Sequence, residues 1–361
     1  MKIDMTPAQL GFHFPAEFDK QTAMWLSWPH KEASWPGKLD SIYDPYCEFL
    51  LRVAEHQTVN INVTNDVMLE FAISKIAGCN YSTNIYNLDE ILKNINFYHH
   101  PTNDAWCRDH GPAFVINPVT KEKAILNWGY NAWGDKYPPY DLDDVIPTLI
   151  GQELGLKVFN PGIVMEGGSV EFNGKGSLLT TKACLLNKNR NPHLSQNEIE
   201  KYLTDYYGVN NILWLGEGIV GDDTDGHIDD ITRFVNEDTV VTVIENDKRD
   251  ENYNILINNL KNLNKMRLQD GKQLNIIELP MPNSVIHDDQ RLPASYANFY
   301  ISNETVIVPL FRDDKNDNIA LDAINACFPD RKVVGIDSFD LIWGLGSFHC
   351  LSQQEPAISN L

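Results

Sequence analysis

One pattern recurs about five times along this chain: a helix, a strand, an irregular polar segment and then a β-hairpin, with connections of very different length. The helices are expected to begin near Asp66, Asp143, Ser195, Asp250 and Asn318. Three hairpins are readable at residues 169–181, 231–244 and 297–310, where turn residues separate two strand-like runs. No linker or low-complexity tract interrupts the pattern, so we expect a single domain over residues 1–361.

Local signals predict the ends of several helices. Ser195 and Glu198 have the spacing of a capping box, and Gly208 is placed to end the same helix. Near the N-terminus, Asp44 and Pro45 suit the first positions of another helix, because Asp accepts from free N–H groups and Pro lacks one.

An unusual polar segment lies between strand and hairpin in each repeat. The five segments are residues 106–112 (WCRDHGP), 165–168 (MEGG), 222–230 (DDTDGHIDD), 292–298 (LPASYAN) and 344–350 (GLGSFHC). If the repeats surround a pseudo-symmetry axis, these equivalent positions meet at one central site. The last repeat lacks its hairpin, so we expect the strand that contains Trp25 and Leu26 to close the ring beside it.

The charge of the chain limits its partners. It has 29 basic and 50 acidic residues, a formal net charge of −21, which argues against nucleic acid or an anionic membrane as the main partner and permits a cationic one. No apolar run approaches the roughly 18 residues of a membrane span, and residues 1–7 carry no apolar signal core. We therefore expect a cytoplasmic protein. Its six cysteines have no CxxC spacing, which indicates reduced thiols.

The polar segments contain a thiol, an imidazole and several carboxylates. Cys350 and His227 alone would suggest acyl transfer, which needs hydrogen-bond donors for a developing oxyanion. The same polar segments also supply Asp109, Glu166 and Asp229, which only accept hydrogen bonds when ionised. Such acceptors suit the N–H fork of a planar cation. The residues therefore favour a guanidinium carbon as the electrophile.

Ordinary explanations of single residues stay open. Cys350 could be a small buried apolar side chain, and Glu166 a surface residue in a turn. A calcium loop is excluded because Gly221 and Thr232 stand at its first and twelfth ligand positions, and HExxH is absent. Residues 313–318 predict a solvated turn before a helix.

Several polar neighbours of the candidate residues are expected to have supporting roles. We expect His110 and His349 to be structural rather than catalytic. The carboxylates Asp222, Asp223 and Asp230 are expected to cap loops or to face solvent.

Seven segments together give a specific resemblance. They are residues 106–112, 131–134 (NAWG), 166–168 (EGG), 184–187 (CLLN), 190–193 (RNPH), 224–229 (TDGHID), and 349–350 (HC) with 353–354 (QQ). In order and nearly end to end, they resemble agmatine deiminases, within the guanidine-modifying family that includes bacterial peptidylarginine deiminases. The resemblance implies a five-bladed, pseudo-symmetric α/β propeller of the pentein type, in agreement with the five repeats.

The resemblance also implies an activity and roles for named residues. It implies hydrolysis of agmatine to N-carbamoylputrescine and ammonia, in putrescine and polyamine synthesis, with no metal or organic cofactor. Cys350 would be the nucleophile that forms an amidino-cysteine intermediate, and His227 the acid and later the base. Asp109 and Asp229 would clamp the guanidinium nitrogens. The further substrate contacts that it implies are Glu166, Trp106 and Asn298.

Residues 344–350 depart from the family pattern. Typical agmatine deiminases are expected to have GGGNIHC where this chain has GLGSFHC, which preserves the chemistry but leaves the substrate open. The alternatives are a deiminase of arginine residues in peptides and a non-catalytic binder of guanidinium ligands. Assembly into a homo-oligomer is also open. Because carboxylates raise a thiol pKa, we expect a bound cation to assist thiolate formation at Cys350.

Overall fold

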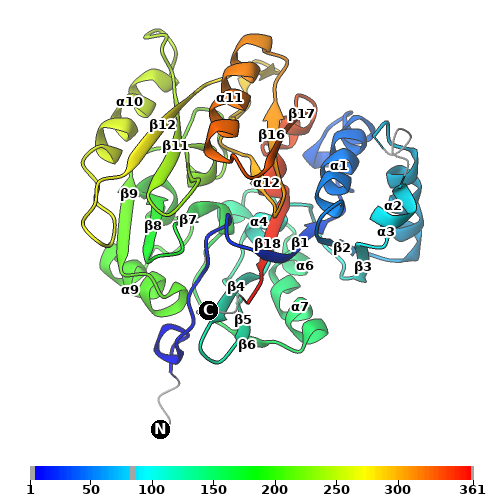
Figure 1. Cartoon of the computed structure of the whole chain (residues 1–361), viewed down its shortest axis with the longest axis horizontal. Coiled ribbons are helices and arrows are strands. Elements are labelled where there is room, and N and C mark those ends of the chain that lie inside the picture. Colours follow the sequence, from blue (N-terminus) through cyan, green and yellow to red (C-terminus); the bar gives the residue numbers. More distant parts are fainter. Residues whose placement is uncertain (1–4, 82–86, 359–361) are drawn as a thin grey trace.

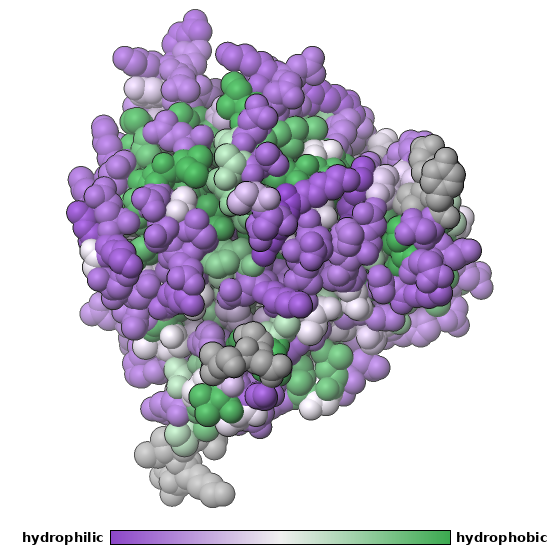
Figure 2. All heavy atoms as spheres, viewed as in Figure 1, coloured by the Kyte–Doolittle hydropathy of each residue, from purple (hydrophilic) through white to green (hydrophobic). Residues whose placement is uncertain are grey.

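The structure is a computed structural model that describes residues 5–81 and 87–358. Residues 1–4 of the N-terminal segment, together with 82–86 and 359–361 of the expected single domain, lie outside the described residues. The fold is mixed α/β, with the longer helices at the periphery and the short helices α4 and α12 near the middle (Figure 1). The face seen in Figure 2 is mostly hydrophilic with scattered hydrophobic patches, in keeping with the acidic sequence.

The strands form five small sheets and one separate hairpin. In sheet order, the five sheets are β18 (Ser352–Pro356), β1 (Gln21–Ser27), β2 (Thr58–Val63) and β3 (Ile95–His99); β4 (Ala113–Asn117), β5 (Glu122–Leu126) and β6 (Lys157–Phe159); β7 (Val170–Phe172), β8 (Ser177–Thr181) and β9 (Asn211–Leu215); β10 (Thr232–Phe234), β11 (Thr239–Ile244) and β12 (Asn275–Pro280); and β15 (Tyr300–Ile301), β16 (Thr305–Leu310) and β17 (Lys332–Asp337). The separate hairpin is β13 (Ile286–His287) with β14 (Gln290–Arg291).

The same pairing recurs in all five sheets. An antiparallel pair is followed by a parallel strand, as in β7–β8–β9 and β10–β11–β12. The three hairpins expected from the sequence are therefore confirmed. The helix and strand of each predicted repeat complete the sheet of the preceding hairpin, because a parallel strand needs a crossover connection.

The first sheet joins distant parts of the chain. β1 pairs antiparallel with β18, with Trp25 opposite Gln353 and Leu26 opposite Ser352, and it pairs parallel with β2. The expected closure by the Trp25 strand is confirmed. Because β18 begins two residues after Cys350, this pairing also fixes the position of the candidate nucleophile.

Helices lie between successive strands along the chain, both within one sheet and from one sheet to the next. They are α1 (Leu39–Ala54), α2 (Asp66–Gly78), α3 (Leu88–Leu92), α4 (Cys107–His110), α5 (Ala132–Asp135), α6 (Asp141–Asp144), α7 (Ile146–Leu154), α8 (Lys182–Leu185), α9 (Gln196–Tyr207), α10 (Asn252–Leu263), α11 (Asp314–Cys327) and α12 (Phe348–Leu351). The short 3₁₀ turns are η1 (Ala8–Leu10), η2 (Glu32–Ser34), η4 (Gly167–Ser169), η5 (Ile228–Asp230) and η6 (Leu341–Gly344). Among the described residues, every helix is too short or too polar to cross a bilayer.

The predicted caps of α9 are present. The Ser195 side chain accepts from the backbone N–H of Glu198, the Glu198 side chain accepts from the backbone N–H of Ser195, and Gly208 ends the helix in a left-handed conformation. The expected starts near Asp66 and Asp250 agree with α2 and α10, whereas Asp143 lies inside the short α6 that precedes α7.

The prediction that a helix begins at Asp44 is wrong. α1 begins at Leu39, so Pro45 lies inside the helix. Proline inside a helix removes a hydrogen-bond donor and normally costs stability. Here the segment before it contributes the buried side chains of Ile42 and Tyr43 to the core, and this burial outweighs the local preference.

The polar run at residues 313–318 is not a solvated turn. The Asp313 side chain accepts from the backbone N–H of Asn316 and caps α11, which therefore begins before Asn318. Asp317 is buried in the first turn of that helix. The helix begins earlier than predicted because its capping residue, Asp313, lies about one turn before the apolar pattern that gave the predicted start.

Four of the five polar segments fold as short helical turns shortly before the first strand of an antiparallel pair. These turns are α4 before β4, η4 before β7, η5 before β10 and α12 before β18. α4 contacts both α12 and η4, and η4 contacts η5. The segments that the repeat pattern makes equivalent are therefore neighbours in space.

Candidate active site

Each of these turns contributes a functional side chain to one buried cluster. Asp109 lies in α4, Asp229 in η5 and Cys350 in α12, while Glu166 and His227 come directly before η4 and η5. Each turn is followed by a strand that is hydrogen-bonded to its neighbour in a sheet. This pairing fixes the position of the turn and of the side chain that it carries. All five are buried.

Asp109 is held by two donors. Its Oδ1 accepts from the backbone N–H of Gly168 at 3.0 Å, and its Oδ2 from Nε1 of Trp133 at 3.0 Å. Burial raises the pKa of Asp109 to about 6. The charge of His227 acts to lower this pKa, and the charge of Asp229 acts to raise it. Asp109 therefore changes its charge near neutral pH.

Trp133 reaches Asp109 from a left-handed turn. Four consecutive residues have positive φ: Ala132 (48°), Trp133 (58°), Gly134 (90°) and Asp135 (61°). The left-handed conformation costs residues other than glycine roughly 1–2 kcal/mol each. Asn131 closes the turn by accepting from the N–H of Gly134 at 2.9 Å. A side chain at Gly134 would put its Cβ 2.5 Å from the Asn189 side chain, so this position needs glycine.

The two carboxylate oxygens of Asp229 have different surroundings. Oδ2 accepts from Nδ1 of His349 at 2.6 Å and from the thiol of Cys350 at 3.7 Å. Oδ1 is without a hydrogen-bond partner among the described residues and lies 3.9 Å from Nδ1 of His227. Burial acts to raise the pKa of Asp229, but the hydrogen bond and charge of His349 outweigh it and hold the pKa below its ordinary value.

His227 is fully buried among carboxylates. Its Nδ1 lies 3.7 Å from Oδ1 of Asp109, and its Nε2 lies 4.0 Å from Oε2 of Glu166. Burial acts to lower the pKa of His227, but the charge of Asp109, with that of Asp229, raises it well above its ordinary value. The imidazole is therefore protonated at neutral pH, and neither nitrogen has a hydrogen-bond acceptor within the described chain.

A buried ion pair holds Glu166. Nε of Arg190 donates to Oε1 of Glu166 at 2.6 Å, and the same guanidinium donates to Asp225 at 2.5 Å. The side chain of Glu166 is fully buried, so the alternative that it is a surface residue is wrong. Its Oε2 has no hydrogen-bond partner in the part of the chain that the structure describes.

These side chains leave a group of unsatisfied buried atoms close together. It comprises Oε2 of Glu166, Oδ1 of Asp229 and both ring nitrogens of His227. Buried polar atoms without partners are uncommon in folded proteins because each costs free energy. Two carboxylate acceptors in such a group suit a ligand that brings its own N–H donors.

Cys350 faces the same group. Nδ2 of Asn298 donates to its sulfur at 2.9 Å, and Oδ1 of Asn298 accepts from its backbone N–H at 3.3 Å. Burial and the charges of Asp229 and Asp230 raise the pKa of Cys350 well above its ordinary value. The expected effect of the carboxylates on this thiol is confirmed.

A cavity of about 340 Å³ leads to Cys350. Trp106, Asp109 and Trp133 line it beside the thiol, and Trp106 stacks on Trp35 with ring centroids 5.1 Å apart. The lining also includes the charged and polar side chains of Lys31, Asp104, Tyr137, Asp223, His287, Asp288 and Gln290. The expected site residues that lie buried behind this lining are Glu166, His227, Asp229 and Asn298.

Glycines provide space at the thiol and the imidazole. A Cβ on Gly168 would lie 2.6 Å from Nδ1 of His227, and one on Gly346 would lie 2.7 Å from the Trp106 ring. Leu345 lines the cavity with φ of 71°, a left-handed conformation, at the position where the family pattern has glycine.

Comparison with known proteins identifies the family. Residues 13–356 match the Porphyromonas-type peptidyl-arginine deiminase family. The chain belongs to this family. A Legionella pneumophila protein described as "putative agmatine deiminase" is 34% identical over 99% of this chain and 98% of its own.

Solved structures of family members agree. Agmatine deiminase of Enterococcus faecalis is 31% identical, with a TM-score of 0.90 and 99% of each chain covered. A cysteine-to-serine variant of C. jejuni agmatine deiminase with substrate bound is 32% identical, with a TM-score of 0.84, covering 95% of this chain and 96% of that one. The resemblance to agmatine deiminases found in the sequence is confirmed.

Four buried residues near the family's motif positions were not assigned to the site from the sequence. Trp133 and Arg190 lie in the NAWG and RNPH segments, where the signal was present but no partner was evident. His349 was expected to be structural, and it contacts Asp229. Asp230 is buried and its Oδ1 accepts from Nδ2 of Asn298 at 2.9 Å. The expectation that Asp230 caps a loop or faces solvent is therefore wrong, because η5 turns two consecutive carboxylates inward.

The expectations for Asp222 and Asp223 are confirmed. Asp222 caps its loop by accepting from the N–H groups of Thr224 at 2.8 Å and His227 at 3.0 Å. Asp223 is part of the cavity rim and pairs there with Lys136.

Two groups bring potential metal ligands within 4.8 Å of one another: Glu166, Cys184 and His227, and Asp229, Asp230 and Cys350. In the first group, Glu166 is already paired with Arg190 at 2.6 Å. In the second, Asp229 is paired with His349 at 2.6 Å. Because these carboxylates already bind Arg190 and His349, both groups are poor metal sites, and the expected absence of a cofactor stays a prediction.

Proposed function

We propose that this protein is an agmatine deiminase, which hydrolyses agmatine to N-carbamoylputrescine and ammonia through an amidino-cysteine intermediate. One observation carries the proposal. The unsatisfied oxygens of Glu166 and Asp229 lie buried behind a cavity that ends at Cys350. A guanidinium group supplies N–H donors in a plane and a carbon that a sulfur can attack.

In the proposed complex, the carboxylates hold the guanidinium. Asp109 and Asp229 accept from its terminal nitrogens, and Glu166 accepts through its free Oε2. Trp106 lies along the cavity wall, where it packs on the substrate. These contacts place the carbon in front of the Cys350 sulfur, and this orientation removes much of the entropic cost of attack.

The first half of the reaction releases ammonia. The Cys350 thiolate forms a C–S bond to the guanidinium carbon, and one C–N bond to a terminal nitrogen then breaks. His227 gives its proton to that nitrogen, which leaves as ammonia. The protonated state of His227, favoured by its pKa, is the state that this step needs.

The second half consumes water. His227, now neutral, takes a proton from a water molecule that attacks the amidino carbon. The C–S bond breaks, Cys350 recovers the thiolate, and the hydroxyl proton of the adduct leaves to solvent, so the carbonyl oxygen of the ureido product comes from water. The same imidazole thus acts first as an acid and then as a base.

The charge of the substrate prepares both groups. Negative charge raises the pKa values of Cys350 and His227 in the free protein. A bound cation offsets that charge, so both pKa values fall when the guanidinium arrives. Thiolate formation is therefore coupled to binding of the correct ligand.

The proposal includes the finer expectations from the sequence. We propose that the five sheets are the blades of a five-bladed pentein-type propeller within one domain, supported by their common strand pairing. We also propose that the protein acts in the cytoplasm in putrescine and polyamine synthesis. Assembly into a homo-oligomer would leave the site complete, because every proposed site residue comes from this chain.

The direct test is an assay of ammonia and ureido product from the purified protein. Agmatine, free arginine and an arginine-containing peptide are compared side by side. The proposal predicts the highest kcat/KM for agmatine. Preferred turnover of the peptide would favour the peptidylarginine alternative, and no turnover of any of the three would favour a non-catalytic binder.

A matched pair of cysteine variants tests the thiol mechanism. Cys350→Ser is expected to abolish ammonia release, because a serine hydroxyl is a much weaker nucleophile than a thiolate. Cys327→Ser alters a half-buried thiol in α11 and is expected to keep normal turnover. Retained ammonia release by Cys350→Ser would refute the mechanism.

A further inference from the structure

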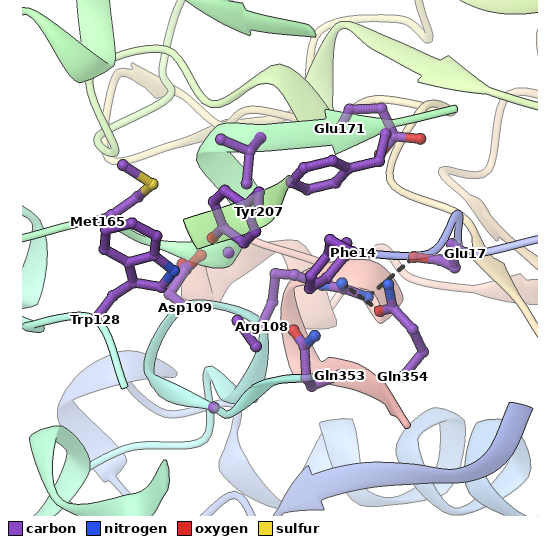
Figure 3. Close-up of a pocket in the computed structure, with 15 residues that line it drawn as sticks. Phe14, Glu17, Arg108, Asp109, Trp128, Met165, Glu171, Tyr207, Gln353 and Gln354 are labelled. Carbon is purple, nitrogen blue, oxygen red and sulfur yellow. Dashed lines mark hydrogen bonds and ion pairs between the residues drawn. The ribbon is translucent and has the colours of Figure 1, made fainter. Parts of the chain in front are cut away.

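A network of buried charges lies directly behind the proposed site, and the inference drawn from it rests on the proposed function. Figure 3 shows Glu17, Arg108 and Gln354 pointing toward one another beside a small cavity of about 20 Å³ that Asp109 also lines. Arg108 donates to Gln354 at 2.6 Å and to Oε2 of Glu17 at 3.1 Å. Nothing in the reaction described above uses these residues.

His349 connects this network to the site. Its Nε2 lies 2.7 Å from Oε2 of Glu17, and its Nδ1 lies 2.6 Å from Oδ2 of Asp229. Both neighbours are carboxylate oxygens, and an ionised carboxylate only accepts. Both ring nitrogens must therefore donate, which requires the imidazolium form of His349.

The charge balance of the network agrees. Three buried carboxylates, those of Glu17, Glu171 and Asp229, face the two guanidinium groups of Arg108 and Arg233. Glu171 pairs with Arg233, whereas Glu17 and Asp229 both hydrogen-bond the His349 ring. An imidazolium between these two carboxylates gives each of the two buried charges a cationic partner.

The Asp229 carboxylate is oriented by this contact. With Oδ2 fixed by His349, its second oxygen stays free on the side of His227. The positive ring also lies against the oxygen that accepts from the Cys350 thiol. It therefore offsets part of the negative charge that opposes thiolate formation.

We propose that His349 is a positioning residue that acts as an imidazolium, anchored by Glu17, and keeps Asp229 ionised and oriented for the guanidinium. Glu17 is thus a distant determinant of activity, although it lies on the far side of His349 from the substrate. Burial acts to raise the pKa of Glu17, but Arg233, His349 and Arg108 hold it far below its ordinary value, so the anchor stays charged.

The pH dependence of Asp229 has several contributors. The charged or titratable groups that act on it are His349, His227, Cys350, Asp109, Asp222, Asp230 and Arg233. Of these, only His349 hydrogen-bonds its Oδ2 through nitrogen. Loss of that contact removes a stabiliser of the carboxylate, so the pKa of Asp229 rises.

His349→Gln tests the proposal in the full-length protein. The variant is expected to lower kcat by about 10- to 100-fold, as loss of an orienting hydrogen-bond partner does elsewhere. The kcat/KM profile is expected to have two acidic limbs, an upper one from Asp109 near pH 6 and a lower one from Asp229. In this variant the lower limb is expected to move to higher pH by about one unit, because Asp229 protonates more easily. A variant with an unshifted lower limb would overturn the proposal.

Glu17→Gln and Glu171→Gln form a matched pair. Both remove one carboxylate that pairs with Arg233, and only Glu17 touches His349. Thermal melting measures the shared loss of stability. Glu17→Gln alone is expected to shift the lower acidic limb. An equal shift in Glu171→Gln would show general loosening and would contradict the proposal.

The protonation state of the His349 ring can be measured by NMR in the absence of substrate. In protein labelled with nitrogen-15 at histidine, the His349 signal is assigned by its absence in His349→Gln. Both ring nitrogens are expected to be protonated at pH 7.5 in the wild type and in Glu171→Gln, and only one in Glu17→Gln. A neutral His349 in the wild type would overturn the proposal. Failure of the proposed function would instead appear as no turnover in the wild type and would leave this result unchanged.

Discussion

Asn298 directs a hydrogen-bond donor at the sulfur of Cys350, with Nδ2 and Sγ 2.9 Å apart. The same amide is fixed on its other side, where it donates to Oδ1 of Asp230 at 2.9 Å. Burial and the negative charges of Asp229, Asp230 and Asp109 raise the pKa of the Cys350 thiol, and this neutral donor opposes them. Asn298 is therefore placed to stabilise the thiolate rather than only to contact substrate.

Asn298→Ala is expected to lower kcat/KM by about 10- to 100-fold, because a hydrogen bond to a charged group contributes ~1.5–3 kcal/mol. The pH at which Cys350 becomes alkylated by iodoacetamide should rise in parallel. Asn259→Ala is the control, since it removes a buried amide that accepts from Gly216, away from the thiol. An alkylation profile identical to that of the wild type would remove the assigned role of Asn298.

Asp109 is expected to set the upper acidic limb of activity, above the one that Asp229 causes. Its pKa of about 6 means that the free protein loses the carboxylate as the pH falls through 6, so kcat/KM should fall there. Trp133→Phe removes a donor to the ionised form and should move the limb to higher pH. Trp214→Phe, which loses a similar bond to Glu200, should not.

The same pKa has a consequence for stability. A carboxyl group whose folded pKa is raised binds its proton more tightly in the folded state, so its contribution to stability falls as the pH rises toward about 6. Relative to the wild type, Asp109→Asn should therefore have a more favourable Tm at pH 7.5 than at pH 5. A difference in Tm that is independent of pH would contradict the raised pKa.

Gly134→Ala is expected to disturb the left-handed turn that holds Trp133. The new Cβ would lie 2.5 Å from the Asn189 side chain, and the residue would have to keep a φ of 90°. We therefore expect a loss of about 1–3 kcal/mol in unfolding free energy and a raised KM. Gly162→Ala isolates the backbone cost, because φ is 80° but the space around it is open. Equal effects of the two changes on KM would show that the turn does not position substrate.

Leu345→Gly tests the departure from the family pattern. Glycine relieves the left-handed strain but removes apolar contact from the cavity wall. Each lost methylene contact costs about 0.8 kcal/mol of binding free energy, so KM for agmatine should rise at least a few-fold. The larger cavity should also improve the arginine peptide relative to agmatine. Lys121→Gly relieves a similar φ of 57° away from the cavity and should leave this ratio unchanged.

Sequence reasoning predicted the features that depend on local pattern. The capping box of Ser195, the three hairpins and the pairing of the Trp25 strand follow from spacing and turn residues, and each is present. The start of α1 could not be found this way. The helix runs through Pro45 because tertiary burial decides there, and burial depends on residues far away in the sequence.

The same distinction explains the site. Repeats made the segments of Asp109, His227 and Cys350 equivalent, and equivalence was enough to place them together. The partners of each group come from elsewhere in the chain. Glu17 reaches His349 across 332 residues, and no spacing rule connects them. Buried charges that pair across such distances in the sequence can be identified only from the folded structure.

The pairing of β1 with β18 has a consequence for biosynthesis. Until residues 352–356 leave the ribosome, β1 has an unpaired edge, and such edges are prone to wrong association. Cys350 enters its place with the same strand. Between the synthesis of Asp229 and that of Cys350, the nascent chain therefore carries its acidic site residues without a nucleophile, and we expect chemical competence to arise in one late step, together with protection of that edge.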